Sequence, residues 1–498
     1  MKKLILLLAL ISFQQFLALS ETYNLDLAKS IDIAKTKSFN MLNLVQDFKI
    51  AENNLKSATS SLKTHINLSL TAPNYSKSVS VFRTDSMAKY YTSRELKYGA
   101  NLNIDQYLPT AGKIYVRTGL NNNDSYSLNG RIPDLYTTFG FDQPLTALYG
   151  YNEIKSKLKL AELDYERSKK GLKREELNIV YLVSNSFYNL LSSQKRTEIA
   201  RLDFDRQKEA FAISQNKYKA GLIKEVDALQ MEVDLAEAQN NYDLSTVNQG
   251  GVLNEFKQLI GIDLSDSVSL SSEFKYDVVI VDPEKAVQLA LENRLEIREQ
   301  EIAIEQNRLN VKKQKSNGMI QSSLNLSYGK EGIGMNGKNY LDLNTTAATA
   351  LNKTYNDFQE RGPNYSIGLT INVPILDFGE NRANVKAAEA KLEQNKLKKI
   401  EVQRDIEREV RNLVANLNSS LKRLQLLEKN VAVAEKSFDI TRQRYSDGDV
   451  DSQGLALERN RLNNALTSHL SAYISYQLML ADIMRKTFFD FHKNESIK

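Results

Sequence analysis

The chain of 498 residues contains no cysteine and only three histidines. Without cysteine there is no disulfide, no thiolate chemistry and no lipid-modified cysteine behind a leader sequence, so packing alone must hold the fold together. The histidines, His65, His469 and His492, fall in different predicted elements. A zinc site and a nucleophile–base pair both lack support, so we expect no metal, no cofactor and no enzymatic activity.

The chain also has little excess charge, since 66 Lys and Arg residues face 61 Asp and Glu residues. No basic run is interleaved with aromatic residues, so we expect no nucleic-acid partner. Lys and Arg mix with Glu along helical stretches, which indicates solvated helix faces. Gly332, Gly334 and Gly337 match the GxGxxG pattern of dinucleotide sites, but they lie in a polar segment where no helix opens.

A long apolar run is missing except near the amino terminus. There two lysines precede the run LILLLALI and the pattern Ala18-Leu19-Ser20, which predicts a secretory signal over residues 1–20 with cleavage after Ser20. A membrane anchor would need about 20 apolar residues, and Gln14-Gln15 interrupts the run. No later segment is apolar enough for a spanning helix, so any membrane crossing is expected to use β-strands.

The order of predicted elements occurs twice along the chain: an amphipathic helix, alternating strands, a proline-marked strand end, a very long helix, a Tyr-x-x-Gly break and another helix. The matching segments are SIDIAKTK (30–37) with AVQLALEN (286–293), FDQPL (141–145) with INVPI (371–375), and YKAGLIKEVDAL (218–229) with YSDGDVDSQGLA (445–456). We predict two helix-strand-helix repeats, residues 21–264 and 283–487, with a linker at 265–282 and a tail at 488–498.

The helical stretches are unusually long. Residues 153–219 contain no proline and only one glycine, Gly171, and would form a helix of roughly 100 Å at about 1.5 Å per residue. In the second repeat, apolar residues spaced by threes and fours form the narrow seam of a coiled coil: Val410, Leu413, Leu417, Leu421, Leu424, Leu427 and Val431. Such a stripe indicates packing between helices.

Between the helices, apolar and polar residues alternate with the period of a strand. The clearest run is Tyr365, Ile367, Leu369, Ile371 and Val373. Its length suits a tilted strand across a bilayer, which needs about 9 to 11 residues. Polar segments at 73–96, 121–133 and 329–363 are expected to be loops at the end of the strands away from the helices. The pattern by itself also fits a soluble sandwich with one wet face.

So few strands cannot close a barrel within one chain, because single-chain outer-membrane barrels begin at about eight strands and an open edge cannot face lipid. Several copies arranged around an axis would satisfy the edges. The same arrangement would place the long helices in a ring and bury their apolar seams.

The two Tyr-x-x-Gly breaks, the strand ends Gln-Pro-Leu and Val-Pro-Ile and the segment AVQLALEN together resemble the TolC-like outer-membrane efflux proteins over residues 25–485. The resemblance implies an α+β membrane protein and a homotrimer. Its long coiled-coil helices would form a trimeric α-barrel across the periplasm, and its strands would join a shared transmembrane β-barrel among the lipids of the outer membrane. Residues 274–282 and the carboxyl-terminal tail would form a belt around the helices.

The function implied by the resemblance is that of a passive conduit in a tripartite efflux or type I secretion system. A periplasmic adaptor protein would couple the conduit to an inner-membrane transporter. The competing function, which would follow if the strands formed a soluble domain, is an exported coiled-coil scaffold or binding protein.

In that family the turns at the two breaks form the periplasmic tip, where the tunnel closes and the adaptor docks. The resemblance assigns this role to Tyr218, Gly221, Asp227, Tyr445, Asp447, Gly448, Asp449 and Asp451. It also implies a hydrogen bond between Tyr445 and Asp227. Val450 departs from the family, which has an arginine there, and Gly454 and Leu457 stand in place of a constricting aspartate pair.

Asp447, Asp449 and Asp451 lie just before those positions. Repeated three times around an axis, they would supply a replacement acidic ring that favours cations. The alternative is a solvated turn that caps the next helix, because Asp is common at helix starts. A calcium loop would need further ligands, and none is evident in the sequence.

Residues 97–120 form a hairpin in addition to the two strands that the family has in each repeat. The sequence leaves two interpretations, a longer strand set in the barrel or an outer flap. We favour the flap.

Overall fold

The computed structural model describes residues 22–84, 87–271, 275–337 and 339–497. The predicted signal at 1–20 and its cleavage at Ser20 lie outside these residues, as does the first residue of the 274–282 segment. The chain divides into two compact units. The helical unit comprises Met1–Lys49, Ser168–Glu299 and Lys399–Lys498, and the strand unit comprises Ile50–Arg167 and Gln300–Lys398.

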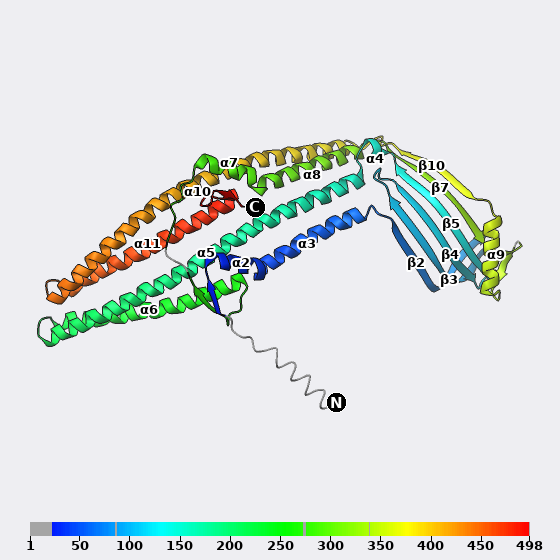
Figure 1. Ribbon diagram of the computed structural model, residues 1–498. Helices are drawn as coiled ribbons and strands as arrows, with labels where there is room; N and C mark the ends of the chain where they lie inside the picture. Colours follow the sequence, from blue (N-terminus) through cyan, green and yellow to red (C-terminus); the bar gives the residue numbers. More distant parts are fainter. Residues whose placement is uncertain (1–21, 85–86, 272–274, 338, 498) are drawn as a thin grey trace, which may run out of the picture. The chain divides into compact units, whose positions relative to one another are not determined.

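The helices carry most of the described chain (Figure 1). Their bounds are α2 Leu27–Lys37, α3 Phe39–Ser60, α4 Thr146–Tyr149, α5 Glu153–Lys219, α6 Glu225–Ile260, α7 Pro283–Asn293, α8 Leu295–Asn317, α9 Ala347–Glu360, α10 Glu380–Asp447 and α11 Ser452–Thr487. Helix α5 has 67 residues and the bounds predicted from the missing prolines. Among the described residues, no helix combines the length and the apolar character that a membrane span requires.

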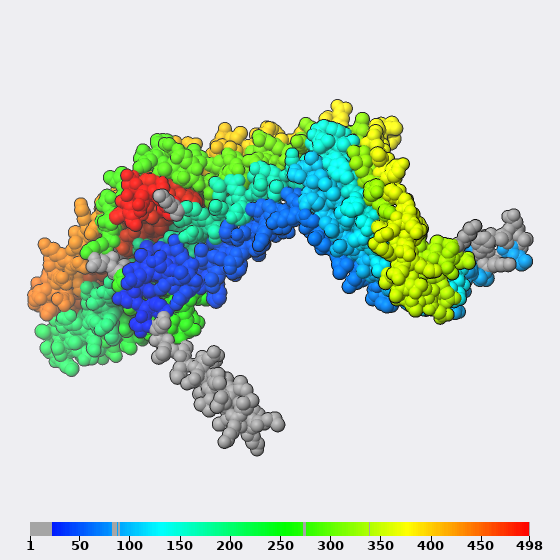
Figure 2. Space-filling view, turned by 45° about the vertical axis from the view of Figure 1, so that its right-hand side comes forward, coloured from blue at the N-terminus to red at the C-terminus, as the bar shows by residue number. Residues whose placement is uncertain are grey.

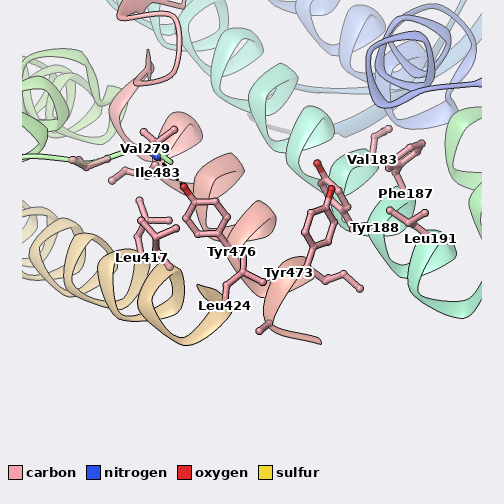
Figure 3. Packing of buried hydrophobic residues seen from close by; sticks show 14 of the residues in the cluster. Val183, Phe187, Tyr188, Leu191, Val279, Leu417, Leu424, Tyr473, Tyr476 and Ile483 are labelled. Carbon is pink, nitrogen blue, oxygen red and sulfur yellow. Dashed lines mark hydrogen bonds between the residues drawn. The ribbon is translucent and has the colours of Figure 1, made fainter. Parts of the chain in front are cut away.

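The core of the helical unit forms where α5, α10 and α11 pack together (Figure 3). Val410, Leu417 and Leu424 of the predicted coiled-coil seam are fully buried there. Tyr476 of α11 is also fully buried, and its hydroxyl donates to the carbonyl of Asp277 at 2.8 Å and accepts from the amide of Val279 at 3.0 Å. The backbone of the segment after residue 274 is therefore fixed to α11 by two hydrogen bonds with the Tyr476 hydroxyl.

Short strands complete the helical unit. Strand β1 (Thr22–Leu25) pairs in parallel with β6 (Ser267–Leu270), and β11 (Phe489–Asp490) pairs with β12 (Glu495–Ser496) in the tail. The tail and the segment before α7 are joined by His492, whose Nε2 lies 2.9 Å from a carboxylate oxygen of Asp277. Both segments therefore lie against the helices of this unit.

The strand unit is built on one antiparallel sheet with the order β10-β7-β5-β4-β3-β2 (Figure 1). The bounds are β2 His65–Thr84, β3 Met87–Tyr107, β4 Lys113–Ser125, β5 Gly130–Pro144, β7 Gln321–Ile333 and β10 Asn364–Asn372, with the short strands β8 Met335–Asn336 and β9 Asn339–Asp342 beside them. Strands β2 and β10 are the two edges of this path, and each is hydrogen-bonded to a single neighbour within it.

The register gives the sheet two chemically different faces. Paired positions place apolar side chains on one face, which we call the apolar face: Ile66, Leu68, Leu70, Leu102, Ile104, Ile114, Val116, Phe139, Phe141, Leu324, Leu326, Ile367 and Leu369. The opposite, polar face carries Asn101, Asn121 and Asp134, which form a chain of hydrogen bonds at 3.1 Å each. The alternation expected from the sequence is therefore present across all six strands.

Two expectations about this region are wrong. The hairpin within 97–120 is no outer flap, because β3 and β4 lie inside the sheet between β2 and β5. The segments 73–96, 121–133 and 329–363 are not plain loops either: β2, β3, β4 and β5 extend far into the first two, and α9 occupies much of the third. Polar side chains on both sides of a strand hid this extra length, because backbone pairing does not require apolar residues.

Candidate functional site

Two helix turns at the end of the helical unit have the same geometry. The first joins α5 to α6, and Gly221 has a φ of 74°; the second joins α10 to α11, and Gly448 has a φ of 93°. In the first, the amide of Gly221 donates to the carbonyl of Tyr218 and that of Leu222 to Lys217, both at 2.9 Å. The second repeats these bonds at positions 448 and 449. This is the Schellman ending of a helix, in which glycine adopts the left-handed backbone.

The three aspartates of the second turn have different environments. Asp451 precedes α11, and its carboxylate accepts the amide of Gly454 at 2.8 Å, so it caps that helix. Asp447 is the last residue of α10 and accepts from the side chain of Gln443 at 3.2 Å. Asp447 and Asp449 are both exposed. The capping interpretation therefore describes Asp451, and two exposed carboxylates remain beside it.

The two turns contact each other through Tyr445. Its side chain is 3% exposed in a cluster with Met231, Phe438 and Leu455, whereas Tyr218, at the equivalent place in the first turn, is 44% exposed. The ammonium of Lys217, in the first turn, donates a hydrogen bond to the carbonyl of Tyr445 and lies 4.6 Å from the centre of the Tyr445 ring. Tyr445 therefore holds the two turns together, whereas Tyr218 does not.

The hydrogen bond expected between Tyr445 and Asp227 is not made in this structure. Asp227 accepts the amide of Lys224 at 3.3 Å, at the start of its own helix. The hydroxyls of Tyr445 and Ser214 are buried without a hydrogen-bond partner among the described residues. Burial raises the pKa of Tyr445, the nearby Ser214 hydroxyl opposes this, and the charge of Asp227 adds to the rise.

Further polar groups are buried on α11, beginning one helical turn after Leu455 of the Tyr445 cluster, and sequence reasoning missed them. Arg459 of α11 lies 3.9 Å from Asp203 of α5, and their side chains are only 12% and 14% exposed. Asn463 donates to the same Asp203 at 2.8 Å. Within the described part of the chain, Nε and Nη1 of Arg459 and Oδ1 of Asn463 have no hydrogen-bond partner. A signal was present, because Arg459 and Asn463 share the helix face of the apolar residues Leu455 and Leu462.

Nothing in this site resembles a metal centre. Over the described ranges, no group of three or more His, Asp, Glu or Cys side chains is arranged to hold an ion. What the site offers is a pair of matched turns, exposed carboxylates and a buried polar cluster with unused hydrogen-bonding capacity.

The sequence profile of the outer membrane efflux protein family matches residues 137–261 and 286–484, which is more than half of the chain. The alkaline protease secretion protein AprF of Pseudomonas aeruginosa is 21% identical over 347 residues, which cover 68% of this chain and 67% of AprF.

Solved structures show the same fold. The CmeC outer membrane channel of Campylobacter jejuni has a TM-score of 0.67 and 15% identity, and the match covers 95% of this chain and 86% of CmeC. The MtrE outer membrane channel of Neisseria gonorrhoeae, in its open state, has a TM-score of 0.65 and 14% identity, with 95% and 90% covered.

These matches confirm the predicted family, the outer-membrane location and the function as the outer-membrane channel component of an efflux or secretion system. The family is one of channels rather than enzymes. The chain belongs to the outer membrane efflux protein family.

Proposed function

We propose that three copies of this chain close a common β-barrel in the outer membrane and a common α-barrel in the periplasm. The observation that carries the proposal is the sheet with one predominantly apolar face and two free edges, β2 and β10. Free edges cannot face lipid, because unpaired backbone groups cost several kcal/mol each in hydrocarbon. Strand β2 runs away from the helices and β10 runs back toward them, so β10 of one copy and β2 of the next would pair antiparallel.

The strand number sets the expected width of the barrel. Six principal strands from each of three copies make eighteen, an even number as antiparallel closure requires. Barrels of about 16 to 18 strands leave an aqueous channel rather than a packed interior. The polar face, with its asparagine network and the Lys113 ammonium 3.8 Å from Asp142, would line this channel.

The helices would carry the conduit inward from the membrane. Helices α3, α5, α8 and α10 all adjoin the same end of the sheet, which would be its periplasmic end. We propose that the two turns form the periplasmic tip, with Tyr218, Gly221, Asp227, Tyr445, Asp447, Gly448, Asp449 and Asp451 as its residues. A periplasmic adaptor would dock there and couple the channel to an inner-membrane transporter. The name of AprF favours export of a polypeptide by such a system.

One feature supports a gate at the tip, and another supports two repeats within the chain. Buried polar atoms that have no hydrogen-bond partner among the described residues, such as the hydroxyl of Tyr445 and Nη1 of Arg459, are costly unless another arrangement satisfies them. The shared hydrogen-bond pattern at Gly221 and Gly448 is expected if the stretches 21–264 and 283–487 are two copies of one unit, separated by the linker 265–282 and followed by the tail 488–498.

Cysteine crosslinking tests the shared barrel, and the chain offers a clean background because it has no native cysteine. Leu68 on β2 and Leu369 on β10 are both three residues from the helix-side end of their edge strands and lie on the apolar face. In isolated outer membranes, the double variant Leu68→Cys/Leu369→Cys treated with a thiol oxidant should give covalent trimers on denaturing gels.

The matched control is Val116→Cys/Leu369→Cys. Val116 lies on the same face at the same height, but its strand β4 is inside the sheet, so this pair should stay monomeric. Monomers from both variants would reject the shared barrel. Release of the protein by osmotic shock without detergent would favour the exported scaffold instead.

A further inference from the structure

The connection between β7 and β10 carries an amphipathic helix on the apolar face of the sheet. Helix α9 begins at Ala347 and ends at Glu360, at the end of the sheet away from the other helices (Figure 1). Gly332 of β7 pairs with Leu135 and so belongs to the apolar face, and a Cβ at Gly332 would lie 2.4 Å from the carbonyl of Thr354. The helix backbone therefore rests directly on β7.

Basic residues of the sheet fix both ends of α9. Arg131 of β5 donates to the carbonyl of Thr345, just before the helix, at 2.8 Å and is held in place by Asp124 at 2.7 Å. Lys330 of β7 donates to the carbonyl of Gln359 at 3.0 Å. Near the same end as Gln359, Asp357 accepts the amide of Ile333 at 2.7 Å. These bonds hold the helix against the sheet rather than leaving it as a free loop.

The helix does not cover the sheet completely, and a groove remains between α9 and strands β2, β3 and β4. Its volume is about 650 Å³. Its apolar lining comes from Leu70, Tyr98, Ala100 and Leu120 of the strands and from Ala347, Ala350 and Leu351 of the helix. In the space-filling view the yellow-green segment of α9 lies over the blue and cyan strands at this end of the sheet (Figure 2).

We propose that this groove holds an acyl chain of a lipid in the outer leaflet of the outer membrane. The inference rests on the proposed function, which places the apolar face in contact with lipid and the end of the sheet away from the helices outside. The groove is continuous with that face through Leu70, Ala100 and Leu120, so hydrocarbon is the medium already present at its mouth. Its volume lies within the range of small-molecule sites, about 300 to 1,000 Å³.

The exposed side of α9 fits the same position. Leu351, which lines the groove, and Tyr355, one turn further along α9, are 44% and 52% exposed, while Asn352 and Asn356 are their polar neighbours on the helix. A helix with this division lies at the boundary between headgroups and acyl chains, with its apolar side in hydrocarbon. Lys330 and Arg131 lie at this level, where basic side chains meet lipid phosphates.

Fluorescence quenching tests the position of the helix. Single variants Leu351→Cys, Asn352→Cys and Ile367→Cys are labelled with bimane and reconstituted in vesicles of phosphatidylcholine with brominated acyl chains. We expect strong quenching at 351 and at 367, and at least threefold less at 352. Quenching at 367 alone would overturn the groove and leave the proposed function intact. No quenching at 367 would overturn the proposed function itself.

Filling the groove tests its occupancy. Ala100→Phe adds a ring inside the groove, and Ile104→Phe adds bulk on the same strand and face outside it. Lipid retained after detergent exchange is counted by mass spectrometry of the intact full-length protein, with phosphatidylcholine and lipid A added in separate arms. Ala100→Phe should lose at least half of the retained lipid and Ile104→Phe should lose none; equal retention in both would overturn the proposal, and the arm with higher retention identifies the source of the chain.

Discussion

At the scale of single residues, the geometry of the two turns depends on Gly221 and Gly448. Their left-handed backbone would cost an alanine roughly 1–2 kcal/mol. Gly171 of α5 is the matched control, since a Cβ there meets nothing within 4 Å and its φ is not positive.

We therefore expect Gly448→Ala to lower the free energy of unfolding by about 1 kcal/mol and Gly171→Ala to keep or raise it by a similar amount. Thermal melting of the purified protein in detergent, followed by circular dichroism, measures the difference. Equal melting temperatures for the two variants would show that the turn is not held in the described backbone.

Tyr445 permits a second prediction at this scale. Its hydroxyl is buried without a partner among the described residues, and such a group destabilises a fold by about 1–3 kcal/mol. Tyr445→Phe should therefore leave the melting temperature unchanged or raise it, while Tyr445→Ala should lower it by removing the ring from its cluster. A clear loss of stability in Tyr445→Phe would mean that the hydroxyl is hydrogen-bonded in the assembled channel.

The sequence located this tyrosine but not its environment. The Tyr-x-x-Gly breaks predicted both turns at the observed glycines, because a backbone with a positive φ favours glycine. The expected hydrogen bond between Tyr445 and Asp227 is absent because the short carboxylate of Asp227 instead accepts a backbone amide at the start of its own helix. No sequence pattern distinguishes these two partners. Arg459 and Asn463 were not predicted, because their burial depends on the contact that α11 makes with Asp203 of α5.

At the scale of elements, an ion network joins the start of α8 to α10 and α11. Arg294, with a side chain 9% exposed, lies 2.7 Å from Glu296 and 2.5 Å from Glu409, and Glu409 also binds Lys486 at 2.5 Å. Burial opposes the ionisation of Glu409, but the hydrogen bonds from Lys486 and Arg294 outweigh it, so its pKa lies below the usual 4.5.

A carboxyl with a lowered pKa stabilises the folded state above its unfolded pKa and loses this contribution as the pH falls through the lowered value. Glu409→Gln should therefore cost roughly 1 kcal/mol at pH 7, a modest value because the side chain is 41% exposed. The cost should vanish well below pH 4.5. Melting curves of both proteins at pH 7 and pH 3 measure it.

Glu407→Gln is the control, because its partner Arg411 is 42% exposed, whereas the partners of Glu409, Arg294 and Lys486, are only 9% and 19% exposed, so the Glu407 pair should contribute little. An effect of Glu409→Gln that stays the same at both pH values would contradict the electrostatic origin.

Long elements were predicted better than short ones. The bounds of helix α5 could be predicted because no proline interrupts its 67 residues. Strand β10 could be predicted because every second residue is apolar. Helix α9 was not predicted because its segment is rich in Asn, Thr and Ala. The helix packs against strand β7 at Gly332 rather than against an apolar core. Strands β3 and β4 pair with their neighbours in the sequence, and the alternating pattern of residues 97–120 fits a flap and a longer strand set equally well, so the pattern could not decide between the two.

At the scale of the whole molecule, the aspartates of the second turn gain meaning only if copies surround an axis. Asp447, Asp449 and Asp451 are all exposed, and Asp451 also caps α11 by accepting the amide of Gly454. Three copies would bring nine exposed carboxylates to one ring, three of them helix caps, and the ring would attract cations.

We expect Asp447→Asn/Asp449→Asn to lower the preference of the channel for cations severalfold, measured as reversal potential across planar bilayers under a KCl gradient. Asp451→Asn should change it less, because the amide of Gly454 and the amino-terminal end of α11 already offset the charge of Asp451, and asparagine retains the helix cap. Unchanged selectivity in the double variant would remove the acidic ring from consideration.

The hairpins of the sheet have a consequence for how such channels change in width. The stretch from α3 to α5 crosses the sheet four times and the stretch from α8 to α10 crosses it twice as principal strands, and each returns to the side from which it left. A single added strand would leave the next helix on the extracellular side of the membrane. The perimeter of the barrel can therefore grow only by whole hairpins. Under threefold symmetry the bore therefore widens in steps of six strands, with no alteration demanded of the periplasmic helices.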